Sequence, residues 1–298
     1  MVTTMISAAD LQKTYHGFCA LDGVSLTIGK GTIFGVIGHN GAGKTTLLKI
    51  LAGLITPTSG TLTVNGIDAG ENAQELKKIL GYLPEESRLY DSMTAHAYLS
   101  FFGEIYELDR ARIRYRTDLL LGSLSLEPDG KKLGELSKGM RRKVAIARSL
   151  LHDPELLVYD EATSGLDPMT SRYIAGYLGE LRRQGKTIVL SAHNLYQVEQ
   201  ICDRVLILRR GKAVACGTMK ELRDLFGSIT YTIWFSPGEK AWEGPGECIR
   251  DGSFCHVDAD NVSAMNRITA EVTKSGGVVD RIESHSPTLE EMLVIVGK

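Results

Sequence analysis

One segment near the amino terminus constrains the fold of this 298-residue chain more than any other. The apolar run 33–37 is typical of a buried strand, and residues 44–51 have the pattern of the helix that follows it. Gly38, Gly41 and Gly43 fill the short turn between them. A buried strand, a glycine-rich turn and a helix in this order predict an α/β fold with helices packed on a sheet.

The turn fits the pattern G-x-x-x-x-G-K-[ST], which acquires meaning only between a strand and a helix. Glycines let backbone N–H groups converge on phosphate oxygens, and the helix N-terminus adds positive potential. Lys44 would reach the terminal phosphates, and the hydroxyl of Thr45 would bind Mg²⁺. The segment therefore predicts a nucleotide site formed by Gly38, His39, Asn40, Gly41, Ala42, Gly43, Lys44, Thr45 and Thr46.

A second apolar run, 156–159, ends in the paired carboxylates Asp160 and Glu161. Asp160 at the tip of a strand would hold Mg²⁺, and Glu161 would accept a proton from attacking water. The alternative is an exposed acidic pair that caps the next helix, which the apolar strand disfavours. No Asn-Lys-x-Asp element that reads guanine occurs, which argues against a GTPase.

The rest of the chain completes the α/β prediction. Apolar runs at 187–190 and 205–208 alternate with helical segments, which indicates a mainly parallel sheet. In stretches 20–28 and 61–64 apolar and polar residues alternate, which predicts an antiparallel β flap, and the pattern of residues 93–126 predicts helices. Four arginines of that block occupy every second position, namely Arg110, Arg112, Arg114 and Arg116. Such spacing spreads them around a helix, which favours solvated side chains over a face that binds phosphate or nucleic acid. We therefore expect a P-loop NTPase core with a helical subdomain.

After Gly227 the residue pattern changes to a strand-like run followed by loops rich in Gly and Pro. We place a domain boundary there, with residues 1–227 as the ATP-binding core and 228–298 as a small α+β C-terminal domain. The second domain should contain strands near 229–235, 254–257 and 278–282, and helices at 262–274 and 288–296. Thr288 and Glu291 fit a capping box. For Trp234 and Trp242 a core position is favoured over an interface.

Composition excludes several classes. Hydrophobic residues make up 43% of the chain, and 34 Lys and Arg balance 36 Asp and Glu, as in ordinary globular proteins and unlike proteins that coat nucleic acid. No apolar stretch of about 20 residues appears, and the start lacks a signal-peptide pattern, so we expect a cytoplasmic protein. The five cysteines are scattered without a C-x-x-C pair, which indicates reduced thiols.

Further motifs lie in a fixed order around the two phosphate-site segments. They are Tyr15, 82–85 (Tyr-Leu-Pro-Glu), 136–141 (Leu-Ser-Lys-Gly-Met-Arg), 164–167 (Ser-Gly-Leu-Asp) and 191–193 (Ser-Ala-His). With Gly38–Thr45 and Asp160–Glu161, this order resembles the ABC ATPase family over about residues 6–225. The resemblance implies that two ATP molecules, each with Mg²⁺, are sandwiched between the subunits of a head-to-tail homodimer.

The resemblance also implies roles for individual residues. Tyr15 would stack on adenine, Glu161 would be the general base, and His193 would contact the γ-phosphate and the attacking water. Ser137 and Gly139 would bind the γ-phosphate held by the opposite subunit, and Asp167 would link the two active sites.

Four positions depart from the family pattern. Lys138 and Met140 replace the Gly and Gln of the common Leu-Ser-Gly-Gly-Gln signature, and Ala162 stands where Pro is usual. Glu85 stands where the family usually has the Gln that contacts Mg²⁺, so either the metal offsets its charge or its side chain points away. Segments written Leu-Ser-Lys-Gly-Met resemble the exporter-type branch, and the ending Thr-Leu-Glu-Glu resembles the small C-terminal domain of that branch.

Two functions remain open. The chain is either the ATPase of an ABC exporter, peripheral on the inner face of the cell membrane under separately encoded permease subunits, or a soluble ABC ATPase that acts on nucleic acid or the ribosome. The balanced charge and the absence of a long coiled-coil insertion or a tandem core favour the exporter, with no nucleic-acid partner. A binding module without catalysis is disfavoured, because Lys44, Asp160, Glu161 and His193 are all present.

Overall fold

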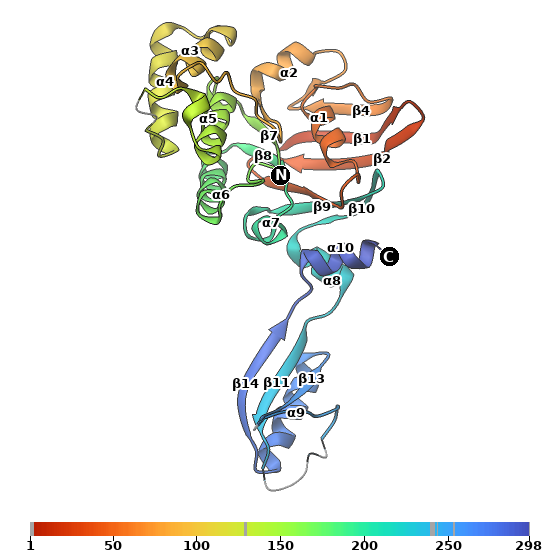
Figure 1. The fold of residues 1–298 in the computed structure, drawn as a ribbon. Coiled ribbons are helices and arrows are strands. Elements are labelled where there is room, and N and C mark those ends of the chain that lie inside the picture. The colour runs from red at the N-terminus through yellow and green to blue at the C-terminus, as the bar shows by residue number, and fades with distance from the viewer. Residues whose placement is uncertain (1–2, 128–129, 239–241, 243, 253, 298) are drawn as a thin grey trace. The chain divides into compact units, whose positions relative to one another are not determined.

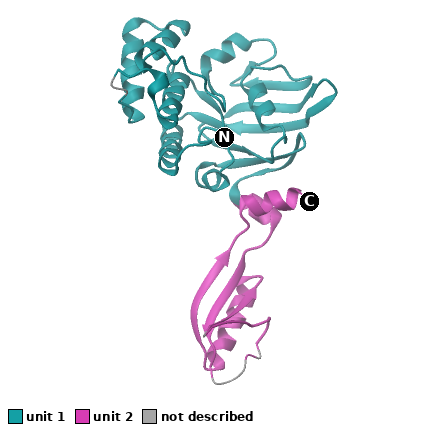
Figure 2. Cartoon of the chain, in the orientation of Figure 1, with its two compact units in different colours: residues 1–219 teal, residues 220–298 magenta. Residues whose placement is uncertain are grey.

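The computed structural model describes residues 3–127, 130–238, 242, 244–252 and 254–297. The chain divides into two compact units, residues 1–219 and 220–298 (Figure 2). This division lies before the expected boundary at Gly227 and groups α8 (Met219–Phe226) mainly with the second unit. The physical reason is local, because Arg223 of α8 donates a hydrogen bond to the carbonyl of Pro287, and the same proline lies beside Gly227.

The first unit is built on a six-stranded sheet of order β10-β9-β3-β8-β7-β6. Its strands are β3 (Ile33–Ile37), β6 (Leu80–Leu83), β7 (Leu156–Asp160), β8 (Thr187–Ser191), β9 (Arg204–Arg209) and β10 (Lys212–Gly217). All neighbours are parallel except β10, which pairs antiparallel with β9. Every residue of β3, β7 and β8 is buried, as a parallel sheet covered on both faces requires. The predicted α/β fold class is confirmed.

A second, antiparallel sheet forms the predicted flap, in the order β2-β1-β4-β5. Its strands are β1 (Thr4–Tyr15), β2 (Phe18–Gly29), β4 (Ser59–Val64) and β5 (Ile67–Asp68). Helix α1 (Lys44–Leu51) contacts both sheets, and its buried leucines join one hydrophobic cluster with residues of β1, β2, β3 and β7. Burial of this shared apolar surface holds the start of α1 in a fixed place.

Of the remaining helices of the first unit, α2, α5, α6 and α7 contact the large sheet, whereas α3 and α4 lie to one side of it (Figure 1). They are α2 (Ala73–Ile79), α3 (Ala95–Ile105), α4 (Arg110–Ser123), α5 (Lys138–Leu150), α6 (Pro168–Arg183) and α7 (Leu195–Ile201). Helices α3, α4 and α5 pack on one another and form the predicted helical block. Helix α7 packs so closely on β3 that a Cβ on Gly35 would lie 3.1 Å from Cγ1 of Val198.

The second unit is a four-stranded antiparallel sheet of order β12-β13-β11-β14 covered by one helix. The strands are β11 (Thr230–Ser236), β12 (Ile249–Asp251), β13 (Phe254–Ala259) and β14 (Val278–His285), and the helices are α9 (Val262–Lys274) and α10 (Leu289–Gly297). The capping box of α10 is confirmed, because Thr288 N donates to Glu291 Oε2 and Glu291 N donates to Thr288 Oγ1. The predicted core position is confirmed for Trp242, which packs against the hydrophobic core of the second unit. It is wrong for Trp234, which lies between the buried Ile233 and Phe235 on β11 and therefore on the face of the sheet opposite to the core.

His152, between α5 and β7, makes the stability of the first unit depend on pH. Its Nε2 donates to the carbonyl of Leu80 at 3.1 Å, its ring stacks on Tyr106, and its buried Nδ1 has no partner among the described residues. Burial lowers the pKa of His152 to about 4 from 6.5. Between pH 6.5 and 4 the unfolded chain therefore binds more protons than the folded chain, so stability falls as the pH falls.

We expect the unfolding free energy of the wild type to drop by about 2 kcal/mol more than that of His152→Gln between pH 7.5 and pH 5. Urea unfolding at the two pH values measures this difference. His96→Gln is the matched control, because His96 is exposed. An identical pH dependence in wild type and His152→Gln would contradict the assignment.

Candidate active site

The glycine turn between β3 and α1 adopts the conformation that a phosphate cradle needs. Gly38 and Gly43 have φ angles of +154° and +104°, and Cβ atoms there would lie 2.3 Å from the carbonyl oxygen of Leu208 and 2.6 Å from that of Ala20. Only glycine satisfies both the backbone conformation and the space. The turn thus leads directly into the N-terminus of α1, where backbone N–H groups are free to bind an anion.

Lys44 begins α1 and is 7% exposed. Its Nζ donates to the carbonyls of Gly38 at 2.8 Å and His39 at 3.2 Å, so the side chain folds back over the turn. Burial lowers the pKa of Lys44, and the negative charges of Glu161, Asp160 and Glu85 act in the opposite direction. The ammonium group therefore lies within electrostatic reach of all three carboxylates.

Asp160 and Glu161 lie at the carboxyl end of β7 and are both buried. Oδ1 of Asp160 accepts a 2.5 Å hydrogen bond from Ser191 Oγ, and the N–H of Glu161 is also directed to Ser191. Oε1 of Glu161 lies 2.5 Å from Nε2 of His193, whereas its Oε2 has no hydrogen-bond partner in the described part of the chain. His193 thus orients the carboxylate through Oε1, whereas Oε2 is buried.

One open cavity of about 430 Å³ brings most of the predicted residues together. Its lining comprises Phe18, Ala20, Asn40, Gly41, Ala42, Gly43, Lys44, Thr45, Thr46, Glu85, Glu161 and His193. The sequence analysis did not single out Phe18, the exposed first residue of β2, although an aromatic residue three positions after Tyr15 was a usable signal. Tyr15 does not line this cavity, and its ring lies 5.2 Å from Nζ of Lys13.

Three other predicted residues lie at helix N-termini outside this cavity. The Oγ of Ser137 accepts from Met140 N and caps α5, and the carboxylate of Asp167 accepts from Thr170 N and caps α6. The same hydrogen bonds to Thr170 lower the pKa of Asp167. Gly139 lies against Thr170, because a Cβ there would be 3.1 Å from its Cγ2. A contact of these residues with nucleotide stays a prediction.

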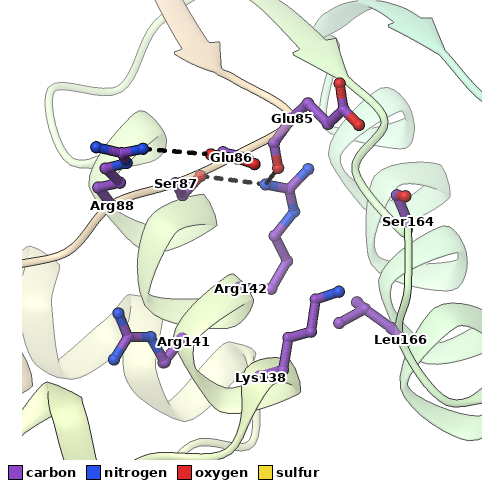
Figure 3. Close-up of a pocket in the computed structure, with 9 residues that line it drawn as sticks. All are labelled: Glu85, Glu86, Ser87, Arg88, Lys138, Arg141, Arg142, Ser164 and Leu166. Carbon is purple, nitrogen blue, oxygen red and sulfur yellow. Dashed lines mark hydrogen bonds and ion pairs between the residues drawn. The ribbon is translucent and has the colours of Figure 1, made fainter.

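Lys138 does not extend freely from α5. Its Nζ would lie only 2.2 Å from a Cβ on Gly165, so the ammonium group packs against the 164–166 turn of the same chain. Lys138, Ser164 and Leu166 line a second pocket of about 380 Å³ with Glu85 and Arg142 (Figure 3). The positive charge that Lys138 brings to the signature segment is thus directed at a turn of its own chain.

The donor set suits Mg²⁺. Thr45 and Glu85 line the cavity, and the carboxylate of Asp160 is close enough to Lys44 to raise its pKa. Hydroxyl and carboxylate oxygens are the ligands that Mg²⁺ takes in addition to phosphates and water. Among the described residues, no group of three or more His, Cys, Asp and Glu is placed to hold a metal ion without other ligands.

Comparisons with known proteins identify the family of this chain. The family model described as "ABC transporter" matches residues 21–164. The chain is 40% identical over 207 residues to the ABC transporter ATP-binding protein NatA of Bacillus subtilis, covering 69% of this chain and 84% of NatA. It is 35% identical over 303 residues to the daunorubicin resistance ATP-binding protein DrrA3 of Streptomyces coeruleorubidus, covering 99% and 96% of the two chains.

Solved structures show the same core. A dimeric ATP-binding cassette in a post-hydrolysis state, bound to ADP and Pi, superposes with a TM-score of 0.66 at 27% identity, covering 72% of this chain and 99% of that one. No helix in the described part of the present chain is long and apolar enough to span a bilayer. With its motifs in order, its cavity and these relatives, the chain belongs to the ATP-binding proteins of the ABC transporter family.

Proposed function

We propose that this protein is the ATP-hydrolysing subunit of an ABC exporter and that it drives a separately encoded membrane permease. The observation that carries the proposal is the convergence of Lys44, Glu161 and His193 on one cavity. Each of these residues comes from a different segment, and each has the chemistry that phosphoryl transfer to water requires. The names of the relatives, a transporter ATP-binding protein and a drug-resistance ATP-binding protein, support the link to transport.

The chemistry follows from the arrangement of the carboxylates. Glu161 lines the cavity and its Oε1 lies against His193, so we expect its carboxylate to accept a proton from the attacking water on the side of His193. Backbone N–H groups of the glycine turn and the ammonium of Lys44 bind the β- and γ-phosphates of ATP. Thr45, Asp160 and Glu85 would hold Mg²⁺, which neutralises the charge that develops on the phosphates.

The dimer is part of the proposal. Ser137, Gly139 and Asp167 lie outside the cavity that the phosphate turn lines, so in one subunit they are free to serve a nucleotide held by another. The dimeric cassette to which this chain is similar supports that arrangement. Closure of a head-to-tail homodimer on two ATP molecules would then be the conformational change that drives the permease.

Purification from detergent-solubilised membranes of its native host tests this function. We expect a tagged chain to co-purify with an integral membrane protein, and the reconstituted pair to hydrolyse ATP at a rate that depends on that partner. Glu161→Gln should co-purify equally well but leave the vesicles inactive. Absence of a membrane partner, together with stimulation of the ATPase by RNA or DNA, would defeat the transport assignment and favour a soluble ABC ATPase.

A further inference from the structure

Arg142 is a buried cation that neither the motifs nor the resemblance singles out. It lies on α5, and only 7% of the residue is exposed. Its guanidinium donates hydrogen bonds to five backbone carbonyls and one hydroxyl. The acceptors are the carbonyls of Pro84 (2.8 Å), Glu85 (3.0 Å), Asp160 (3.1 Å), Glu161 (2.7 Å) and Ala162 (2.8 Å) and the hydroxyl of Ser87 (3.1 Å).

These acceptors belong to two segments that are far apart in the sequence. Nη1 binds only the 84–87 segment that follows β6, whereas Nη2 and Nε bind only the 160–162 turn that follows β7. Figure 3 shows the guanidinium directed at Glu85 and Ser87 from the α5 side. Arg142 is thus a bridge between the segment of Glu85 and the turn of Glu161, and it is anchored on the helix that Ser137 caps.

Packing alone does not explain a guanidinium at this place. All six acceptors are neutral, and burial of a charge against neutral partners costs stability that an apolar residue of similar volume would not lose. Burial lowers the pKa of Arg142 to about 10, while Tyr159, Asp160 and Glu85 act to raise it and Arg148 to lower it. The planar fork of five N–H donors is the property that no other side chain offers.

The 160–162 turn, which Arg142 holds, contains a strained backbone. Glu161 has a φ angle of +51°, a left-handed conformation that is uncommon for a residue with a side chain. Its N–H is directed to Ser191 on β8, and its carbonyl accepts from Nη2 of Arg142 at 2.7 Å. Both peptide groups that flank its Cα are therefore held, and the carboxylate is left to point to His193 and the cavity.

We propose that Arg142 is a positioning residue for ATP hydrolysis, which holds the general base Glu161 in its strained turn and ties that turn to the Glu85 segment. The inference rests on the proposed role of Glu161. Because one guanidinium bonds to both segments, a displacement of residues 84–87 changes the place of Glu161, so the hydrolysis rate depends on the position of the Glu85 segment. The guanidinium bonds to backbone carbonyls and to Ser87, and Arg142 does not line the cavity of the glycine turn, so it acts through Glu161 and is not itself a catalytic residue.

Chemical rescue separates positioning from a merely structural role. In Arg142→Ala we expect kcat for ATP to fall roughly 100-fold, as for a misplacement of about 1 Å, while KM changes less than threefold because the phosphate turn is intact. Added ethylguanidinium should restore kcat at least about tenfold by refilling the vacated bonds, whereas ethylammonium, which lacks the fork, should not. Steady-state kinetics with each additive measure both effects.

Two variants complete the test. Arg142→Lys keeps the charge but places three donors on one atom, so we expect its kcat to fall as in Arg142→Ala without rescue by ethylguanidinium. Arg142→Lys also provides the test of positioning if Arg142→Ala does not fold. Arg141→Ala is the matched control on the same helix, because Arg141 bonds to Asp91 and Leu133 instead and should keep kcat within twofold.

Each other outcome overturns the proposal. Full kcat in Arg142→Lys would show that charge suffices, a raised KM at unchanged kcat would assign Arg142 to nucleotide binding, and failure of ethylguanidinium to rescue Arg142→Ala would leave only a structural role. The proposed function fails separately, since a wild type without ATPase activity, or an active Glu161→Gln, would defeat it whatever Arg142 does.

Discussion

Glu161→Gln is expected to lower ATP turnover at least about 100-fold, because an amide oxygen cannot take the proton of the attacking water. ATP binding should persist, since the phosphate turn and Lys44 are unchanged and the substituted side chain has nearly the same shape. With hydrolysis blocked, the variant should also accumulate as an ATP-bound dimer. Phosphate release measures the first effect, and size-exclusion chromatography with ATP and Mg²⁺ measures the last.

The control for this change is Glu180→Gln on the exposed side of α6, where the carboxylate pairs only with surface groups. We expect wild-type turnover and no trapped dimer there. An unchanged hydrolysis rate in Glu161→Gln would remove Glu161 from the role of base, even though it lies beside His193 in the cavity.

Lys44→Ala is expected to weaken ATP binding itself, by roughly 10- to 100-fold in Kd, because one charge-assisted hydrogen bond to the phosphates is lost. The fold should persist, since the Lys44 ammonium makes only side-chain bonds to the carbonyls of Gly38 and His39. The substitution relieves the desolvation of the buried cation and also removes its attraction to Glu161, Asp160 and Glu85, so the two effects on stability oppose each other. Isothermal titration calorimetry with ATP measures the affinity.

Lys49→Ala provides the comparison, because Lys49 lies on the same helix but is exposed at its last turn. Its ATP affinity should equal that of the wild type. Intact affinity in Lys44→Ala would argue against the assignment of the glycine turn as the phosphate site.

The sequence predicted the elements whose pattern is local. β3, β7 and β8 are continuous apolar runs, and their complete burial follows from that pattern. The short or exposed strands β5, β10 and β12 carry no such signal, because pairing with a neighbour and not composition makes them strands. The predicted core position of Trp234 was wrong, because hydrophobicity alone does not tell on which face a residue lies when only one face of the sheet is covered by a helix.

By itself, the sequence determined where the glycine turn and the carboxylate pair lie, because each is a set of residue types at fixed spacing next to one apolar strand, β3 for the turn and β7 for the pair. Only the tertiary structure decided how the segments meet: that Glu161 is held between His193, Ser191 and Arg142, and that Lys138 packs on Gly165. These contacts join residues far apart in the chain, and whether a given donor reaches a given carbonyl depends on how helices pack on the sheet. No local pattern records that distance.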